Sequence, residues 1–242
     1  MLKASTINDI RASGDAMLAI RRCRHGTMMY MRQDIYVGRS FAEYGEYSEG
    51  EVDVFRQCVR PGDVALNELG NVRALPVALG RAAGRTKVPA LDYRGANNFG
   101  GIALGAAEGE DVAVVVLDEV ELPKVRLIKV DVEGMELDVL AGARQTLARH
   151  RPILYVENDR ADKAEALVAR LLEDGYRMWW HTPPLYNPAN FLGNPQNVFG
   201  NIVSFNMLCL PRETAAPPQG LREIATPQEA SGFLRGLPKA TR

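Results

Sequence analysis

The chain has 242 residues, enough for one α/β domain with extensions, and its content of 46% hydrophobic and 24% charged residues excludes a disordered or fibrous protein. Its 29 basic and 30 acidic residues give a formal net charge of -1, which provides no long-range field to hold a nucleic acid or an anionic membrane. No apolar run reaches the ~20 residues of a membrane span, and the first residues lack a signal-peptide core, so we expect a cytoplasmic protein.

The amino-terminal part predicts an extension followed by the first elements of a domain. Residues 1–26 have an apolar spacing that suits a short amphipathic helix, with no residue of obvious catalytic type. The segment from 27 to 59 predicts a strand pair and then a helix over 48–59. Ser48 and Glu51 have the spacing of a capping box at the start of that helix.

The middle of the chain predicts strands joined by a glycine-rich loop. Residues 86–93 (TKVPALDY) predict an edge strand, residues 95–105 (GANNFGGIALG) a loop, and residues 111–120 (DVAVVVLDEV) a further strand. This part of the chain carries no cluster of chemically reactive side chains.

Buried strands and amphipathic helices alternate in the second half of the chain. Apolar runs at 125–131 (VRLIKVD) and 152–157 predict buried strands, each followed by a helical pattern, and two further strands are predicted at 177–181 and 201–210. This alternation favours an α/β fold with a mostly parallel sheet, built mainly from these four strands. The tail from 211 to 242 lacks sustained periodicity, so we expect a mobile or loosely docked extension.

Acidic residues follow the first two of these strands directly. Asp131 ends one run, and Glu157 and Asn158 end the next. The carboxyl ends of neighbouring parallel strands meet at one edge of a sheet, so these side chains are expected to converge on a ligand site. Such oxygen donors suit Mg²⁺. The alternative, equally compatible with the residues, is that these acids cap the following helices or pair with Lys129 and Arg160.

Several motifs together resemble the FkbM family of methyltransferases. They are IKVDVEGMELDVLAGA followed by RPILYVEN, with YGEYSEGEVDVF, NVRALPVALG and ANNFGGIALG upstream, and the resemblance covers about residues 28 to 210. It implies a Rossmann-like class I methyltransferase fold with S-adenosylmethionine as the methyl donor. It also implies a hydroxyl acceptor on a small molecule, a sugar or a lipid-like compound.

The resemblance assigns roles to particular residues. Asp131, Glu133 and Glu136 fall on the family's DVEG.E pattern. Glu157 and Asn158 fall on its second strand end. Asp131 and Glu157 are therefore expected to be catalytic, and together with Asn158 to be the ligands if a metal binds.

Three further residues are weaker candidates. His181, in the late loop region, is the downstream histidine that would serve as a base, although a plain packing role explains it more simply. Glu46 and Ser48 are expected, by analogy, to contact the cofactor together with Asp131. The capping box accounts for Ser48 without a cofactor.

One part of the family pattern is missing. Val72 follows Asp63 by only 9 positions, whereas a strand, a crossover helix and a second strand need ~30 residues. The methyltransferase-like domain, 27–210, therefore reads as truncated near 64–67 by loss of its first βαβ region. No G-x-G occurs in the chain, so we expect S-adenosylmethionine to bind weakly or not at all.

The truncation leaves two main interpretations open, and a third is disfavoured. The chain is a working O-methyltransferase, or it is a catalytically inactive remnant that acts as a binding or scaffold module. A metal-assisted hydrolase is disfavoured because no nucleophile elbow or histidine-rich ligand set is present. Loss of a central strand also exposes sheet edges, which can pair with another copy of the chain, so a homo-oligomer is one of the expected interactions.

Overall fold

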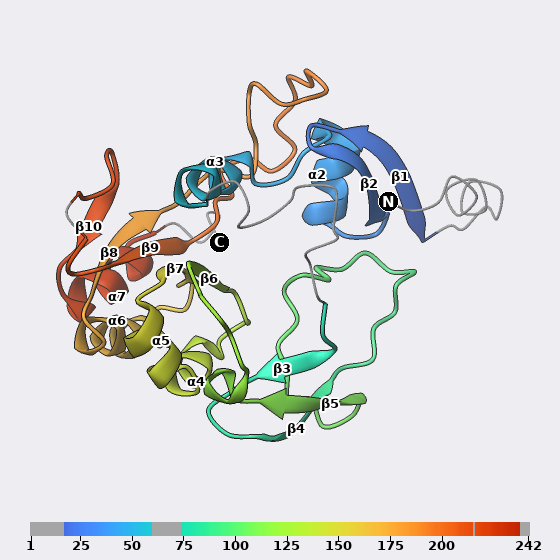
Figure 1. The fold of residues 1–242 in the computed structure, drawn as a ribbon. Helices are drawn as coiled ribbons and strands as arrows, with labels where there is room; N and C mark the ends of the chain where they lie inside the picture. Colours follow the sequence, from blue (N-terminus) through green and yellow to red (C-terminus); the bar gives the residue numbers. More distant parts are fainter. Residues whose placement is uncertain (1–16, 60–73, 215, 238–242) are drawn as a thin grey trace. The chain divides into compact units, whose positions relative to one another are not determined.

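A computed structural model describes residues 17–59, 74–214 and 216–237 (Figure 1). The chain divides into two compact units. The first unit combines residues 1–74, 90–102 and 184–200. The second combines residues 75–89, 103–183 and 201–242. Each unit is therefore assembled from segments that are distant in the sequence.

The first unit contains an antiparallel hairpin and two helices. Strand β1 (Leu18–Cys23) pairs with β2 (Gly26–Met31), and helices α2 (Val37–Tyr44) and α3 (Glu49–Cys58) follow. The amphipathic helix predicted within 1–26 is wrong for Leu18–Cys23, which forms a strand, and residues 1–16 lie outside the described residues. The predicted strand pair after residue 27 is wrong in its second member, because Val37–Tyr44 is helical.

Helix α3 confirms the predicted helix, but the predicted capping box is wrong. Ser48 adopts a left-handed conformation with φ of 50°, and its side chain makes no capping hydrogen bond. Its backbone carbonyl instead accepts a hydrogen bond from the Glu51 N–H, at 2.9 Å. The left-handed backbone turns the Ser48 hydroxyl away from the first turn, and no partner for this buried hydroxyl is found among the described residues.

The second unit is organised around a five-stranded sheet in the order β10-β8-β9-β7-β6. Its strands in chain order are β6 (Leu127–Val130), β7 (Ile153–Glu157), β8 (Tyr176–His181), β9 (Asn206–Pro211) and β10 (Arg222–Ile224). The prediction that the first four of these strands share one sheet is confirmed.

The sheet is mixed, so the prediction of a mostly parallel sheet is wrong. Strands β6 and β7 are parallel neighbours, but β9 lies between β7 and β8 and is antiparallel to both. Strand β10 adds to β8 in the antiparallel direction. Consequently β6, β7 and β8 all run in one direction, and their carboxyl ends lie on the same rim of the sheet.

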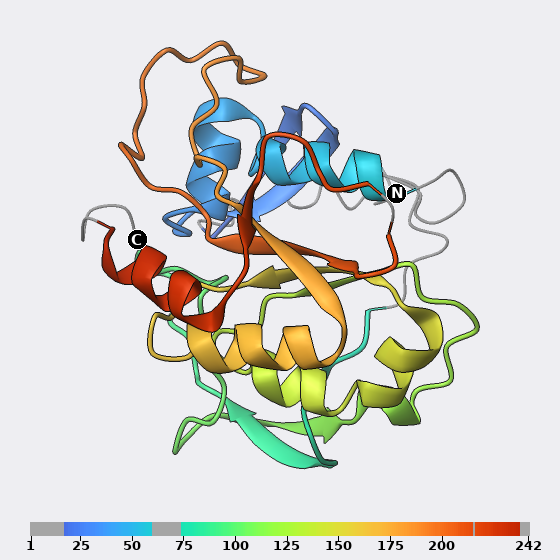
Figure 2. The same ribbon diagram turned by 90° about the vertical axis from the view of Figure 1, so that its left-hand side faces the viewer.

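Four helices cover one face of this sheet (Figure 2). They are α4 (Glu136–Ala141), α5 (Arg144–His150), α6 (Ala164–Glu173) and α7 (Pro227–Arg235). Alternate strand residues such as Val130, Val156 and Met207 pack with them in the hydrophobic core. The single helix predicted after residue 131 is split at Gly142, where a Cβ atom would lie 2.1 Å from the Gly80 carbonyl oxygen.

A second, three-stranded sheet belongs to the same unit. Strand β5 (Glu110–Val115) lies between β3 (Val77–Leu79), which is parallel to it, and β4 (Gly84–Val88), which is antiparallel. A short 3₁₀ helix, η2 (Leu117–Glu119), follows β5. The strand predicted at 111–120 is confirmed up to Val115 and wrong beyond it, where η2 follows, and the edge strand predicted at 86–93 is confirmed only up to Val88. The proposed deletion near 64–67 lies outside the described residues.

The described part of the tail forms regular structure, in contrast to the mobile extension that was predicted. Strand β10 pairs with β8, and helix α7 buries Ala230 and Leu234 completely. The capping box that starts α7 joins Thr226 and Glu229, with Pro227 in the first turn. This T-P-Q-E pattern is present in the sequence. It was overlooked because the surrounding residues are rich in Pro, Gly and Arg, a composition typical of irregular segments.

Candidate functional site

Three carboxylates converge at the carboxyl ends of β6 and β7. One oxygen from each of Asp131, Glu133 and Glu157 lies within 4.8 Å of the others. The parallel register places Val130 beside Val156, so the next residues of both strands, Asp131 and Glu157, emerge together. The predicted convergence of Asp131 with Glu157 is observed, and Glu133 joins them.

The turn after β6 aims Glu133 into this cluster. Glu133 and Gly134 both have positive φ angles, of 53° and 93°. The φ of 93° at position 134 favours glycine, whereas the atoms nearest to an added Cβ, Lys163 Nζ at 2.8 Å and Arg160 Nε at 2.9 Å, belong to flexible side chains that can move. The Gly134 N–H donates to Glu136 Oε1 at 2.8 Å, which holds the turn closed.

Two cations neutralise part of the cluster. Lys129 Nζ pairs with Asp131 Oδ2, and Arg160 pairs with Glu133 Oε2 at 2.9 Å. The alternative expected from the sequence was that the acids at these strand ends pair with Lys129 and Arg160. The structure shows such pairs for Asp131 and Glu133. No such pair is found for Glu157 among the described residues.

Glu157 is the least satisfied of the three acids. Its Oε2 atom is buried and has no hydrogen-bond partner among the described residues. Burial, reinforced by the negative charges of Asp131, Asp159 and Glu133, raises the pKa of Glu157 to about 9. Burial also raises the pKa of Glu133. Glu157 is therefore protonated at neutral pH unless a cation occupies the cluster.

Asn158 lies on the other side of the strand from Glu157. It is 3% exposed, and its Nδ2 donates to Met207 Sδ at 3.3 Å. Its backbone N–H donates to the Phe205 carbonyl at 2.8 Å. Successive strand residues point to opposite faces, so the Asn158 side chain does not join Asp131 and Glu157. The third group of the cluster is the Glu133 carboxylate.

His181 lies on the same rim, at the end of β8. Asn206 of β9 pairs with Glu157 on one side and His181 on the other, so the two residues are level and two strand spacings, roughly 10 Å, apart. His181 Nδ1 is hydrogen-bonded to the hydroxyl of Tyr155, at 2.7 Å. Tyr155 precedes Glu157 by two residues and shares its face, so His181 is fixed to the face that carries the acids.

Glu46 and Ser48 belong to the first unit. The Glu46 carboxylate accepts hydrogen bonds from Arg24 Nε at 2.6 Å, Asn187 Nδ2 at 2.7 Å and the Phe191 N–H at 2.8 Å. Glu46 is buried, and these bonds attach the loop at 184–200 to the rest of the first unit. The described structure thus gives Glu46 a full set of protein partners.

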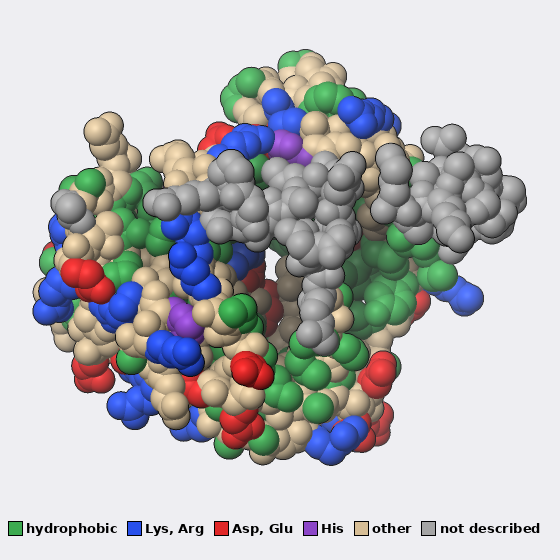
Figure 3. All heavy atoms as spheres, viewed as in Figure 1, with side chains coloured by type: hydrophobic (Ala, Val, Ile, Leu, Met, Phe, Trp, Pro, Cys, Tyr) green, Lys and Arg blue, Asp and Glu red, His purple; other side chains and the backbone are tan. Residues whose placement is uncertain are grey.

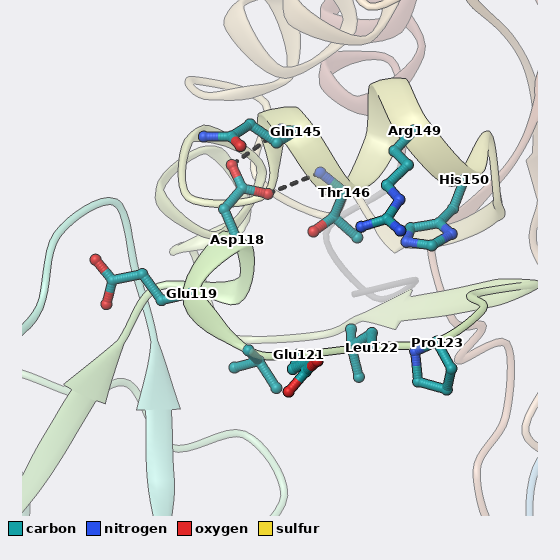
Figure 4. A pocket seen from close by; sticks show the side chains of 10 residues that line it. Asp118, Glu119, Glu121, Leu122, Pro123, Gln145, Thr146, Arg149 and His150 are labelled. Carbon is teal, nitrogen blue, oxygen red and sulfur yellow. Dashed lines mark hydrogen bonds between the residues drawn. The ribbon is translucent and has the colours of Figure 1, made fainter.

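A cavity of about 590 Å³ lies at the opposite rim of the sheet (Figure 4). Its walls come from η2, the segment before β6 and the last residues of α5, including Arg149 and His150. Asp118 accepts hydrogen bonds from the Gln145 and Thr146 N–H groups, at 2.9 and 2.8 Å, and so caps α5 beside this cavity. The cavity adjoins the amino ends of β6 and β7, and the acidic cluster lies at their carboxyl ends.

The fold and the cluster define a mixed α/β protein with an acidic site on the rim where two parallel strands end. Within this chain, residues 95–178 match the family model described as the methyltransferase FkbM domain, which confirms the resemblance over that segment. The match includes all three acids of the cluster, and His181, Glu46 and Ser48 lie outside it. No curated protein and no solved structure is similar enough to this chain to count as a match. Among the described residues, none of the helices has the length and apolar character to cross a membrane.

Proposed function

We propose that this chain is an S-adenosylmethionine-dependent O-methyltransferase that acts on a hydroxyl group of a small-molecule, sugar or lipid-like acceptor. The observation that carries the proposal is the convergence of Asp131, Glu133 and Glu157 inside the segment that matches the FkbM domain. In an α/β sheet, ligands bind outside the carboxyl ends of the strands, which is where these acids lie.

The charge of the cluster suits the donor. S-adenosylmethionine supplies an activated methyl group on a positively charged sulfonium. Lys129 and Arg160 pair with Asp131 and Glu133, so an excess of negative charge arises when Glu157 ionises, which a cation bound beside it favours. Glu133 and Glu157 are partly buried whereas Asp131 is exposed, so a lowered dielectric constant strengthens the attraction of a cation mainly at the two glutamates.

Transfer to a hydroxyl also requires a group that accepts the hydroxyl proton. Glu157, whose pKa is raised to about 9, is a stronger base in its ionised form than an ordinary carboxylate. Glu157 is therefore the first choice for this step when a bound cation, such as the sulfonium of the donor, keeps its carboxylate ionised. His181, held by Tyr155 on the same face of the sheet, is the second choice.

A divalent cation would change how the cluster works. Three carboxylate oxygens within 4.8 Å of one another are suited to a hard ion such as Mg²⁺. Bound there by Asp131, Glu157 and Glu133, it would keep Glu157 ionised and orient the acceptor oxygen. Asn158, expected as a ligand from the sequence, donates its amide to Met207 instead.

The proposal is tested by methyl transfer from labelled S-adenosylmethionine to a panel of hydroxylated acceptors, with Mg²⁺ or with a chelator. Asp131→Asn is expected to lower transfer by ~100-fold or more, since it removes charge at the reacting centre. Asp111→Asn, at an exposed acid on β5, is the matched control and is expected to leave transfer unchanged.

The missing glycine-rich turn favours one other function, that of an inactive remnant acting as a binding or scaffold module. No transfer to any acceptor by the folded wild-type chain would support that function and contradict the proposed enzyme. Transfer that Asp131→Asn leaves intact would show that the acidic cluster is not the active site.

A further inference from the structure

A second cavity, of about 400 Å³, lies on the same rim as the acidic cluster. It is formed within the second unit where β8 ends, β10 begins and α7 passes, and Trp180, His181, Arg222 and Phe233 line it. Its volume lies within the ~300–1,000 Å³ that small-molecule sites commonly occupy. Because β8 runs parallel to β6 and β7, this cavity opens at carboxyl ends, as a ligand site in an α/β sheet does.

Aromatic rings form part of its wall. The rings of Trp180 and Phe233 pack with their centroids 4.8 Å apart and their planes inclined by 37°. Trp180 is only 5% exposed, so its position is fixed by the core, whereas Phe233 is half-buried. The flat apolar surface that a planar ligand can contact therefore comes mainly from Phe233, and the nearly covered Trp180 supports that ring from behind.

The charge of the cavity is positive. No Asp or Glu side chain lines it, and the exposed Arg222 guanidinium lies 5.4 Å from the centre of the Phe233 ring. Glu223, the neighbour of Arg222, pairs with Arg177 at 2.9 Å. Arg222 has no ion-pair partner among the described residues, so its charge is available to an anionic ligand.

We propose that this cavity binds the methyl acceptor, and that the acceptor is a planar, apolar hydroxy compound with a carboxylate group. The ring would lie against Trp180 and Phe233, and the carboxylate would pair with Arg222, whose guanidinium fork matches it. This assignment rests on the proposed methyltransferase function.

Two features connect the cavity to the acidic cluster. The first is charge, because acids at the ends of β6 and β7 favour a cationic donor, while Arg222 favours an anionic acceptor farther along the same rim. The second is His181, which lines the cavity and is hydrogen-bonded to Tyr155 on the face that carries Glu157. Trp180 and its partner Arg222 lie on the helix-covered face, opposite to His181, so the acceptor hydroxyl would reach the donor around the carboxyl end of β8, past His181.

Calorimetric titration without S-adenosylmethionine tests the assignment, with 4-hydroxybenzoate as the anionic probe and 4-hydroxybenzyl alcohol as the neutral one. The wild-type chain is expected to bind 4-hydroxybenzoate at least ~10-fold more tightly than the alcohol, as one charge-assisted contact provides. Arg222→Gln is expected to remove this preference. Arg235→Gln, at an exposed cation of α7 that does not line the cavity, is expected to retain it.

Equal binding of the two probes, no binding of either, or a preference that survives Arg222→Gln would overturn the assignment. Circular dichroism of each variant shows that the substitution leaves the fold intact. Because no methyl donor is present, the result is independent of methyl transfer. A chain that binds 4-hydroxybenzoate through Arg222 but transfers no methyl group would contradict the proposed function and leave the anion-binding cavity standing.

Discussion

At the acidic rim, the environment of Glu157 strongly raises the pKa of its carboxyl group. Its folded-state pKa of about 9 lies far above the value of ~4.3 for an exposed glutamate. Between these two values the folded chain holds a proton that the unfolded chain has released. Raising the pH through this range therefore destabilises the folded state.

Glu157→Gln is expected to remove this pH dependence, because glutamine does not titrate. In the presence of a chelator, wild-type stability should fall from pH 5 to pH 9, and the variant should be more stable than wild type at pH 8 by ~1–2 kcal/mol. Urea unfolding across this pH range measures the difference. The control Glu173→Gln, at an exposed acid of α6, should follow the wild type. A Glu157→Gln chain less stable than wild type at pH 8 would show that the ionised carboxylate is stabilised after all.

The sequence predicted the acidic rim only in part. Asp131 and Glu157 could be predicted from the sequence because each follows an apolar run of strand length. The contribution of Glu133 depends on its left-handed backbone and on the glycine after it, which the pattern of apolar residues does not encode. The inward position of Asn158 follows from strand alternation, and the register that decides it is set by the pairing of β7 with β9.

At the scale of elements, short helices depend on caps supplied from elsewhere in the chain. Helix α5 has seven residues, begins at Arg144 and has no side-chain cap from its own N-cap residue, Ala143. Asp118 of η2 supplies the cap through two backbone N–H groups. Burial alone would raise the pKa of Asp118, but these hydrogen bonds lower it, so the cap stabilises the folded state most when the carboxylate is ionised.

Asp118→Ala is expected to destabilise the second unit by ~1–2 kcal/mol at pH 7, the range measured for lost caps. The loss should shrink as the pH falls through the lowered pKa of Asp118, because the wild-type carboxylate is then protonated and caps less well. Thermal unfolding at several pH values measures this. Asp111→Ala on the exposed part of β5 serves as the comparison. Equal stability of Asp118→Ala and wild type at pH 7 would show that α5 needs no cap.

At the scale of the whole molecule, the acidic rim lies in the second unit, whereas Glu46 and the loop at 184–200 belong to the first. The chain also lacks a G-x-G turn, the backbone feature that lets a cofactor approach a strand-to-helix turn. The missing turn is the reason to expect weak binding of the proposed donor.

We therefore expect S-adenosylmethionine to bind the full chain weakly, with a dissociation constant above ~100 μM in a calorimetric titration. Addition of 4-hydroxybenzoate should not restore tight binding if the missing turn is the cause. A dissociation constant of a few micromolar would show that other segments of the chain rebuild the donor site.

By itself the sequence determined four of the five strands of the main sheet, the helices after the first two of them and two of the three acids at the rim, because strand and helix periodicity depend on local residue patterns. Tertiary structure alone decided that β9 enters between β7 and β8, that the tail from Arg222 to Arg235 packs as β10 and α7, and that Asp118 caps a helix 26 positions further along the chain, at Arg144. The physical reason is that pairing partners, caps and the burial of a carboxylate depend on residues distant in sequence, whose approach is set by the packing of the whole unit.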